Sequence, residues 1–204
     1  MLPLVVSLLI SSVLPGVYNS QDISRNTNDP ILYELHTRNL LGSYTFLGIF
    51  RGAESALRLD LDRCLKAQYN GSSYMGFRHH VTYMHQRSAN GDANWPQREI
   101  NVLIKVSIDG GYARVYITPL EGKPFPPVLK GPLKVLYANE ECFLLEHEEK
   151  LEDHPACTLW LPFTKLERPP QECINKYKSK CRTERRLDYK PWKGLCGFSS
   201  EVDI

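Results

Sequence analysis

The chain has 204 residues, a formal net charge of +2 at pH 7 and 6 cysteines. This length suits one domain with a sizeable core, and so small a net charge singles out no class of partner. The charges are unevenly spread, however, because acidic residues gather around 140–153 and basic residues around 176–193. We interpret both stretches as solvated surface, since acids are interspersed in the basic tail, and expect no nucleic-acid partner.

Residues 1–18 are the first predicted segment, a secretory signal peptide. The apolar run from Leu2 to Leu14 has the size of a signal-peptide core and is too short for a membrane span, although a basic start is missing. No later stretch of the sequence is long and apolar enough to cross a bilayer. We therefore expect residues 19–204 to form a single secreted domain, monomeric and not bound to a membrane.

Secretion decides how the cysteines are interpreted. An oxidising compartment favours disulfides over zinc binding or thiol catalysis, so the 6 cysteines predict three bridges and no metal site. The nucleophile, phosphate-loop and zinc-protease motifs of common enzymes are missing as well. We expect neither an enzyme nor a cofactor.

The predicted elements begin with a short helix at residues 30–40, where Ile31, Leu35 and Arg38 fit one amphipathic face. Short strands separated by turn signals follow as far as residue 162. Besides the two arms of a hairpin at 101–119, the expected strands cover residues 43–50, 62–69, 74–85, 133–137, 142–147 and 157–162. Eight mostly antiparallel strands in one small domain predict a closed barrel, which is wide enough for one small ligand.

The hairpin NVLIKVSIDGGYARVYITP is the clearest of these signals. With Gly110 and Gly111 as a two-residue turn, the apolar residues of both arms share one face of the sheet. The expected cross-strand pairs are Ile104 with Ile117, Val106 with Val115, and Ile108 with Ala113.

Two local motifs lie near the strands at 62–69 and 74–85. Asn70-Gly71-Ser72 is a glycosylation sequon placed where a turn would expose it, so we expect Asn70 to carry a glycan. His79 and His85 share a strand face but lie roughly 20 Å apart. Because His80 points the other way, these histidines do not predict a shared metal ion.

The stretch PPQECINKYKSKC predicts a second helix, which opens after Pro169 and Pro170. Cys173, Tyr177 and Cys181 recur every four residues and therefore lie on one helix face. Eight residues of helix span roughly 12 Å, which excludes a bridge between the two cysteines. An economical arrangement joins them to the strand cysteines Cys142 and Cys157, in either combination, and leaves Cys64 and Cys196 for each other.

The cysteine pattern resembles that of the tick salivary lipocalins, which include the histamine-binding proteins. The shared order is a cysteine, an acidic loop, a Cys-x-Leu-Trp sequence, a helix with a cysteine, an aromatic residue and a second cysteine, and a terminal cysteine. Here those residues are Cys142, Cys157, Leu159, Trp160, Cys173, Tyr177, Cys181 and Cys196, and RCLKA around Cys64 matches the early-strand cysteine.

This resemblance implies an all-β fold, an eight-stranded antiparallel lipocalin barrel with a C-terminal α-helix packed outside and a short N-terminal helix. The disulfides that it implies are Cys64–Cys196, Cys142–Cys173 and Cys157–Cys181. It also implies that the protein sequesters a small host mediator, either a biogenic amine such as histamine or a lipid mediator. A host immune protein, such as a complement component, is the alternative partner.

Two positions shift the expected ligand from an amine towards a lipid. A protonated amine inside a barrel needs carboxylates, and amine-binding members of the family often carry Asp just after the first cysteine of the pair and Glu just before Leu-Trp. Phe143 and Thr158 occupy these positions here. An eicosanoid, a fatty acid or a sterol suits such side chains better, unless Glu99, Glu141 or Glu146 supplies a carboxylate.

Aromatic side chains suit both classes of ligand, because imidazole, indole and lipid all pack well against rings. The predicted ligand-binding residues are Phe143, Thr158, Trp160, Glu141, Trp95 and Tyr116. Further aromatic candidates for the interior or its mouth are Tyr74, Phe77 and Tyr83.

Overall fold

The computed structural model describes residues 29–43, 46–53, 62–85, 96–123, 125–147, 155–181 and 186–188. The predicted signal peptide, Trp95 and Cys196 lie outside these ranges. Within them, no helix has the length and apolar character needed to cross a membrane.

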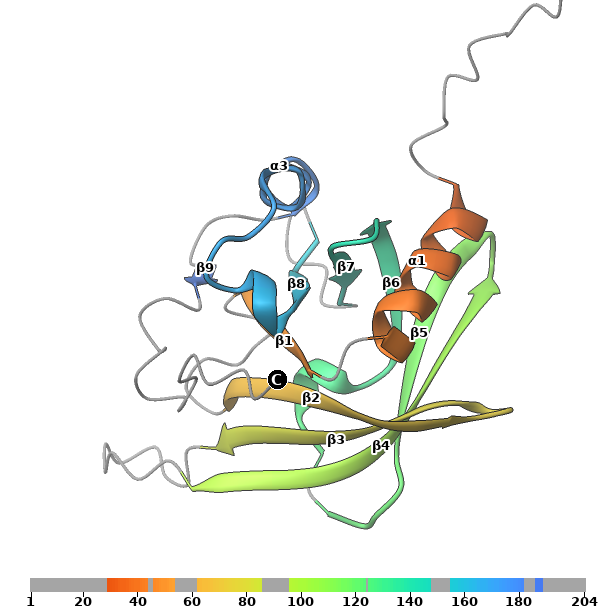
Figure 1. Cartoon of the computed structure of the whole chain (residues 1–204), viewed down its shortest axis with the longest axis vertical. Coiled ribbons are helices and arrows are strands. Elements are labelled where there is room, and N and C mark those ends of the chain that lie inside the picture. The colour runs from red at the N-terminus through yellow and green to blue at the C-terminus, as the bar shows by residue number, and fades with distance from the viewer. Residues whose placement is uncertain are drawn as a thin grey trace, which may run out of the picture.

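A single antiparallel sheet forms most of the described structure (Figure 1). Its strands are β1 (Phe46–Ala53), β2 (Asp62–Ser73), β3 (Gly76–His85), β4 (Gln97–Asp109), β5 (Tyr112–Pro119), β6 (Pro132–Ala138), β7 (Phe143–Glu146), β8 (Cys157–Pro162) and β9 (Arg186–Asp188). Strands β1 to β8 pair in chain order, and β1 pairs with both β8 and β2, so these eight strands close into the expected barrel.

The remaining elements are helices. They are α1 (Pro30–Ser43), α3 (Gln171–Lys180) and two short 3-10 turns, η1 (Pro127–Leu129) and η2 (Phe163–Lys165). Strand β9 was not predicted. It lies in the basic stretch that we interpreted only as solvated surface, and pairs with the second half of β1, at Arg51 to Ala53.

The β4–β5 hairpin has the predicted register. Ile104 lies opposite Ile117, Val106 opposite Val115 and Ile108 opposite Ala113. Gly110 and Gly111 make the turn with φ of 58° and 79°, the left-handed region that glycine occupies without steric cost. The register fixes which side chains of each strand face the barrel interior.

Alternation along β4 identifies the inner face. Ile100, Val102, Ile104 and Val106 are buried, whereas the residues between them are more exposed. The pairing carries this face around the barrel, because Ile100 lies opposite Val81, which in turn lies opposite Ala67. The core is therefore the barrel interior itself, lined by every second residue of each strand.

Helix α1 packs at one end of the barrel, against β2, β4, β5 and β6. Contacts there include an Arg38 Nη1 hydrogen bond of 3.5 Å to the Val106 carbonyl and an edge-to-face contact between Tyr33 and Tyr137. Its buried residues are Tyr33, Thr37, Leu40 and Leu41. The predicted face was wrong, since Ile31 and Leu35 are 67% and 52% exposed.

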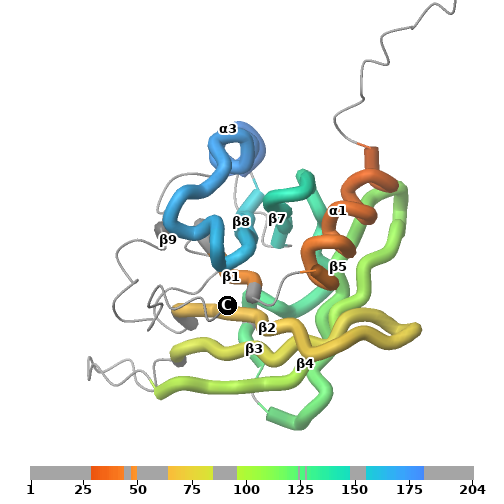
Figure 2. Tube along the Cα trace, in the orientation of Figure 1, coloured from red at the N-terminus to blue at the C-terminus, as the bar shows by residue number. Residues whose placement is uncertain are grey.

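Helix α3 packs outside the barrel over β7 and β8 (Figure 2). Cys173 and Tyr177 form its buried stripe as predicted, each 0% exposed. Cys181, expected on the same helix face, lies just after the helix in extended conformation and is 2% exposed. The helix covers the outer face of β8 while the barrel interior covers the inner face. All six residues of β8 are buried for this reason.

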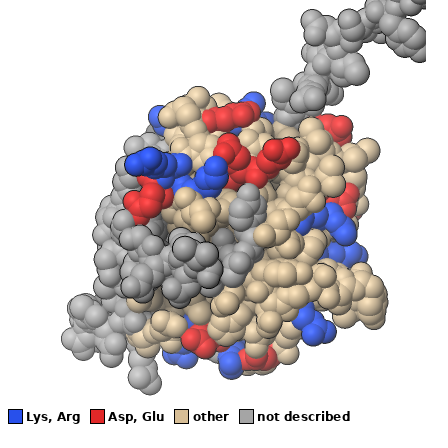
Figure 3. Space-filling view, viewed as in Figure 1, with Lys and Arg blue, Asp and Glu red and all other residues tan. Residues whose placement is uncertain are grey.

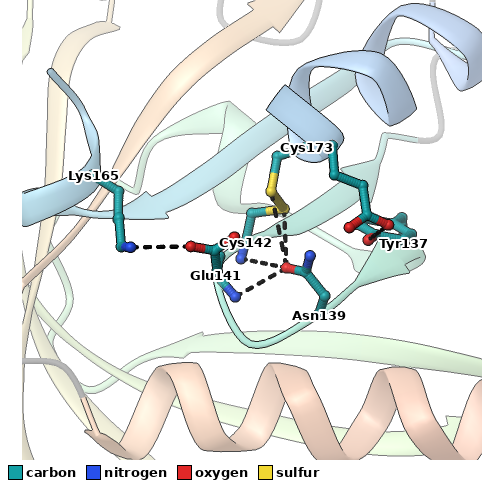
Figure 4. Close-up of a disulfide and its surroundings, with 7 residues drawn as sticks. Tyr137, Asn139, Glu141, Cys142, Lys165 and Cys173 are labelled. Carbon is teal, nitrogen blue, oxygen red and sulfur yellow. Dashed lines mark hydrogen bonds and ion pairs between the residues drawn. A yellow bond between two sulfur atoms is a disulfide. The ribbon is translucent and has the colours of Figure 1, made fainter. Parts of the chain in front are cut away.

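Two disulfides fasten α3 to the barrel, in the pairing that the family resemblance implies. Cys142 is joined to Cys173 with a Cα–Cα distance of 6.3 Å, and Cys157 to Cys181 with 5.8 Å. Beside the first, Asn139 Oδ1 accepts the backbone N–H groups of Glu141 and Cys142, each at 2.9 Å, and so shapes the turn before β7 (Figure 4). Cys64 is disulfide-bonded too, and its expected partner lies outside the described residues.

Peptide mapping without reduction tests this arrangement directly. We expect Cys173 to be recovered with Cys142 and Cys181 with Cys157, because each helix cysteine meets a different strand. A peptide containing Cys64 should be linked to one containing Cys196. Recovery of Cys173 joined to Cys181 would contradict the position of α3.

Candidate functional site

The inner face of β7 and β8 carries a stacked pair of aromatic rings. Phe143 lies directly opposite Trp160, which lies opposite Ile49 on β1. The rings of Phe143 and Trp160 are 5.8 Å apart at their centres and inclined by only 8°. Both side chains are buried, with exposures of 2% and 4%. This part of the inner wall is therefore apolar and aromatic.

Thr158 supplies the polar centre of the same wall. The Trp160 Nε1–H donates to Thr158 Oγ1 at 2.9 Å, because an indole nitrogen can only donate. His147 Nε2 lies 2.9 Å from the same oxygen, and this bond can run in either direction. We call Phe143, His147, Thr158 and Trp160 the Trp160 cluster. Its hydrogen bonds satisfy the Thr158 hydroxyl within the protein.

His147 is an interior residue that the sequence analysis did not single out. The alternation of Phe143, Leu145 and His147 places it on the inner face, and it is 6% exposed. Burial lowers the pKa of its imidazole to about 4. The ring is neutral at pH 7, so the Trp160 cluster carries no charge.

A second group of buried polar atoms lies at the α1 end of the barrel. His79, opposite Val102 on the inner face, donates its Nε2–H to the Leu41 carbonyl at 3.0 Å. Burial lowers the His79 pKa to about 4, so the ring is neutral and its Nδ1 is an acceptor. Neither His79 Nδ1 nor the buried Thr37 Oγ1 has a hydrogen-bond partner among the described residues.

The three carboxylates that might have served an amine all lie outside the barrel. Glu99 belongs to the outward-facing series of β4, and its Oε2 lies 3.5 Å from His80 Nε2. Glu146 pairs with Lys134 at 3.4 Å on the outer surface. Glu141 lies in the turn before β7 and pairs with Lys165 at 3.0 Å (Figure 4). Acidic and basic side chains adjoin one another in the upper part of Figure 3, where α3 lies.

Of the predicted ligand-binding residues, the structure brings Phe143, Thr158 and Trp160 together and separates the others. Tyr116 alternates with the inward-facing Val115 and Ile117, and its hydroxyl donates to Asp109 Oδ2 at 2.7 Å on the exposed surface. Glu141 points to Lys165, and Trp95 lies outside the described residues.

The other aromatic candidates differ in how deeply they are buried. Tyr83 is 4% exposed, opposite Arg98 on β4. Phe77 packs partly buried near Arg38 of α1, and Tyr74 is 98% exposed in the β2–β3 turn.

The remaining local predictions concern Asn70 and the histidines of β3. Asn70 is exposed near the end of β2, within the strand rather than just past it. His80 bonds Asn101 Oδ1 at 3.0 Å on the outer face, whereas His79 is interior. The ring nitrogens of these two histidines therefore lie on opposite sides of the sheet.

Comparison with known proteins identifies the family. Residues 63–197 match the model of the tick histamine binding protein family. Among solved structures, japanin from Rhipicephalus appendiculatus, crystallised with cholesterol, is similar in fold, with a TM-score of 0.51 and 13% identity over 73% of this chain and 93% of that one. No match is found among curated protein sequences. Because the family model spans most of the chain, including the cysteines that fasten α3 to the barrel, the protein belongs to the tick histamine-binding protein family and is a ligand-binding lipocalin.

Proposed function

We propose that this protein is a secreted, monomeric lipocalin that sequesters a small apolar lipid mediator inside its barrel, and that it has no enzymatic activity. In this proposal residues 1–18 are the signal peptide, residues 19–204 the single mature domain and Asn70 a glycosylated surface position. The observation that carries the proposal is the chemistry of the inner wall at Phe143 and Thr158, where amine-binding members of the family often have acids.

An amine is disfavoured because a protonated amine away from water needs an opposing charge. Glu99, Glu141 and Glu146 all lie on the outer surface with basic or imidazole partners. The described inner wall instead offers mostly hydrocarbon and aromatic surface. Japanin, which is similar in fold, was crystallised bound to cholesterol, an apolar ligand.

The α1 end supports a lipid that carries a hydroxyl group. His79 Nδ1 accepts a hydrogen bond, and Thr37 Oγ1 both donates and accepts. Each is buried with no partner among the described residues, a state that costs about 1–3 kcal/mol per group. A hydroxyl on the buried part of the ligand, as in a sterol or a hydroxylated fatty acid, would satisfy either atom.

Titration calorimetry with histamine, serotonin, a leukotriene and a fatty acid tests the class of ligand. We expect a lipid to bind with a dissociation constant of about 1 μM or lower and histamine to bind at least about 100-fold more weakly, a difference of about 3 kcal/mol. Submicromolar histamine binding would contradict the inference from Phe143 and Thr158.

The alternative function is binding of a host immune protein through the acidic loop. Residues 148–154 of that loop lie outside the described residues. Failure of all the small molecules to bind a folded sample would favour this alternative over the lipid proposal.

A further inference from the structure

Arg98 lies on the inner face of the barrel. It precedes Ile100 by two residues in β4, so its side chain belongs to the same series as the buried Ile100, Val102 and Ile104. Its partner on β3 is Tyr83, which is 4% exposed and continues the inner series of His79 and Val81. A half-buried, positively charged side chain thus belongs to a strand face that is mostly apolar and aromatic.

The guanidinium of Arg98 has an unsatisfied donor. Its Nε atom is buried and has no hydrogen-bond partner among the described residues. Two other arginines differ in this respect, because Arg38 pairs with Glu34, and Arg114 with Asp109. A guanidinium stays charged at any physiological pH, and leaving a charged donor unpaired out of water is unfavourable. An anionic partner from outside the chain would remove this cost.

The position of Arg98 suits the head group of a long ligand. Helix α1 packs near Val106, at the far end of β4 from Arg98. The four residues from Arg98 to Val102, which lies opposite His79, span roughly 13 Å of strand, and the eight residues to Val106 roughly 26 Å. The inward side chains after Arg98 are aliphatic. A chain that enters from the Arg98 end would therefore place its hydrocarbon on apolar surface.

We propose that Arg98 binds the carboxylate of a long-chain carboxylic acid, whose hydrocarbon chain extends along the inner face of β4 towards α1. This inference rests on the proposed function and narrows its ligand from lipids in general to lipid acids. A guanidinium matches a carboxylate through two parallel N–H···O hydrogen bonds. The same charge repels a protonated amine.

Calorimetry with oleic acid and its methyl ester, below their aggregation limits, tests the role of Arg98. The two probes share one hydrocarbon chain and differ in the negative charge. Wild-type protein should bind the acid at least about tenfold more tightly than the ester, and Arg98→Gln should weaken acid binding by about 10- to 100-fold, because hydrogen bonds to charged groups contribute that much. Binding of the ester should not change.

Two further variants separate the role of Arg98 from general effects. Arg98→Lys keeps the charge without the paired donors and should restore part of the affinity for the acid. Arg78→Gln removes an exposed arginine of the neighbouring strand and should change neither ligand. Circular dichroism checks that each variant is folded.

The outcomes distinguish this inference from the proposed function. Equal affinity for acid and ester, unchanged in Arg98→Gln, would overturn the role of Arg98 while leaving the lipid proposal standing. Failure of wild-type protein to bind either probe or any other lipid would overturn both.

Discussion

Lowering the pH from 7 to about 5 is expected to reduce the free energy of unfolding by about 4 kcal/mol, because His79 and His147 are both buried in the neutral form. Each has a pKa of about 4 in the folded protein against 6.5 for an unperturbed histidine. The unfolded chain therefore binds protons first as the pH falls. Urea unfolding followed by circular dichroism at a series of pH values measures the effect.

The direction of this effect follows from the lowered pKa values. The stabilising contribution of each neutral ring is complete above pH 6.5 and is lost as the pH falls towards 4. At about pH 5 each histidine accounts for a loss of about 2 kcal/mol. Variants isolate the contribution of each histidine.

The variant His147→Gln isolates the contribution of one of the two histidines. Glutamine keeps a hydrogen-bonding group near Thr158 Oγ1 but does not titrate, so this variant should lose about half of the acid sensitivity between pH 7 and 5. An unchanged pH profile in His147→Gln would show that this ring is not held neutral in the folded protein.

Strong local signals allowed parts of the fold to be predicted. The Gly110-Gly111 turn fixed the β4–β5 register, because a turn at residues 109–110 would keep the same faces but place Lys105 opposite Arg114, an unfavourable pair of like charges. In α3, the four-residue spacing of Cys173 and Tyr177 identified the buried stripe. In both cases the spacing of residues in the sequence predicts the same face that burial selects in the structure.

Other features depend on contacts that the sequence does not show. Helix α1 has apolar residues all around, so Ile31 and Leu35 looked as suitable for burial as Leu40 and Leu41, and only the packing against the barrel decided. Strand β9 has three residues and exists as a partner of β1. No local pattern marks so short an edge strand.

The strand around 133–137 shows how one irregularity changes the assignment of side chains. Simple alternation would place Tyr137 beside Val135 inside the barrel. The register shifts between these two residues, and Tyr137 turns outward to donate its hydroxyl to Glu172 of α3 at 2.6 Å. A bulge of this kind has no clear sequence signal.

The alternation of side chains along the strands was enough to predict part of the inner wall. Phe143 and Thr158 were correctly expected to point inward, and the same alternation extended by two residues would have found His147. Alternation also placed Tyr116 with Arg114, opposite the apolar face of β5, so its exposure could have been anticipated. Arg98 was missed because a basic residue near a strand end is usually solvated.

Replacing Trp160 by alanine is expected to reduce the free energy of unfolding by about 3–5 kcal/mol, as for other large aromatic side chains removed from a core. Trp160 is 4% exposed, stacked on Phe143 and hydrogen-bonded to Thr158. Alanine would remove the stack and leave a cavity in the inner wall. Urea unfolding at neutral pH measures the loss.

Trp160→Phe separates the ring from its N–H group. It keeps an aromatic partner for Phe143 but removes the donor to Thr158 Oγ1, so the expected loss is about 1–2 kcal/mol. Tyr74→Ala deletes an aromatic ring that is 98% exposed and should cost almost nothing. In a lipid-binding barrel Trp160→Phe should also alter lipid affinity, because the ring forms part of the inner wall. A loss below about 1 kcal/mol in Trp160→Ala would mean that this ring is not packed in the wall of the barrel.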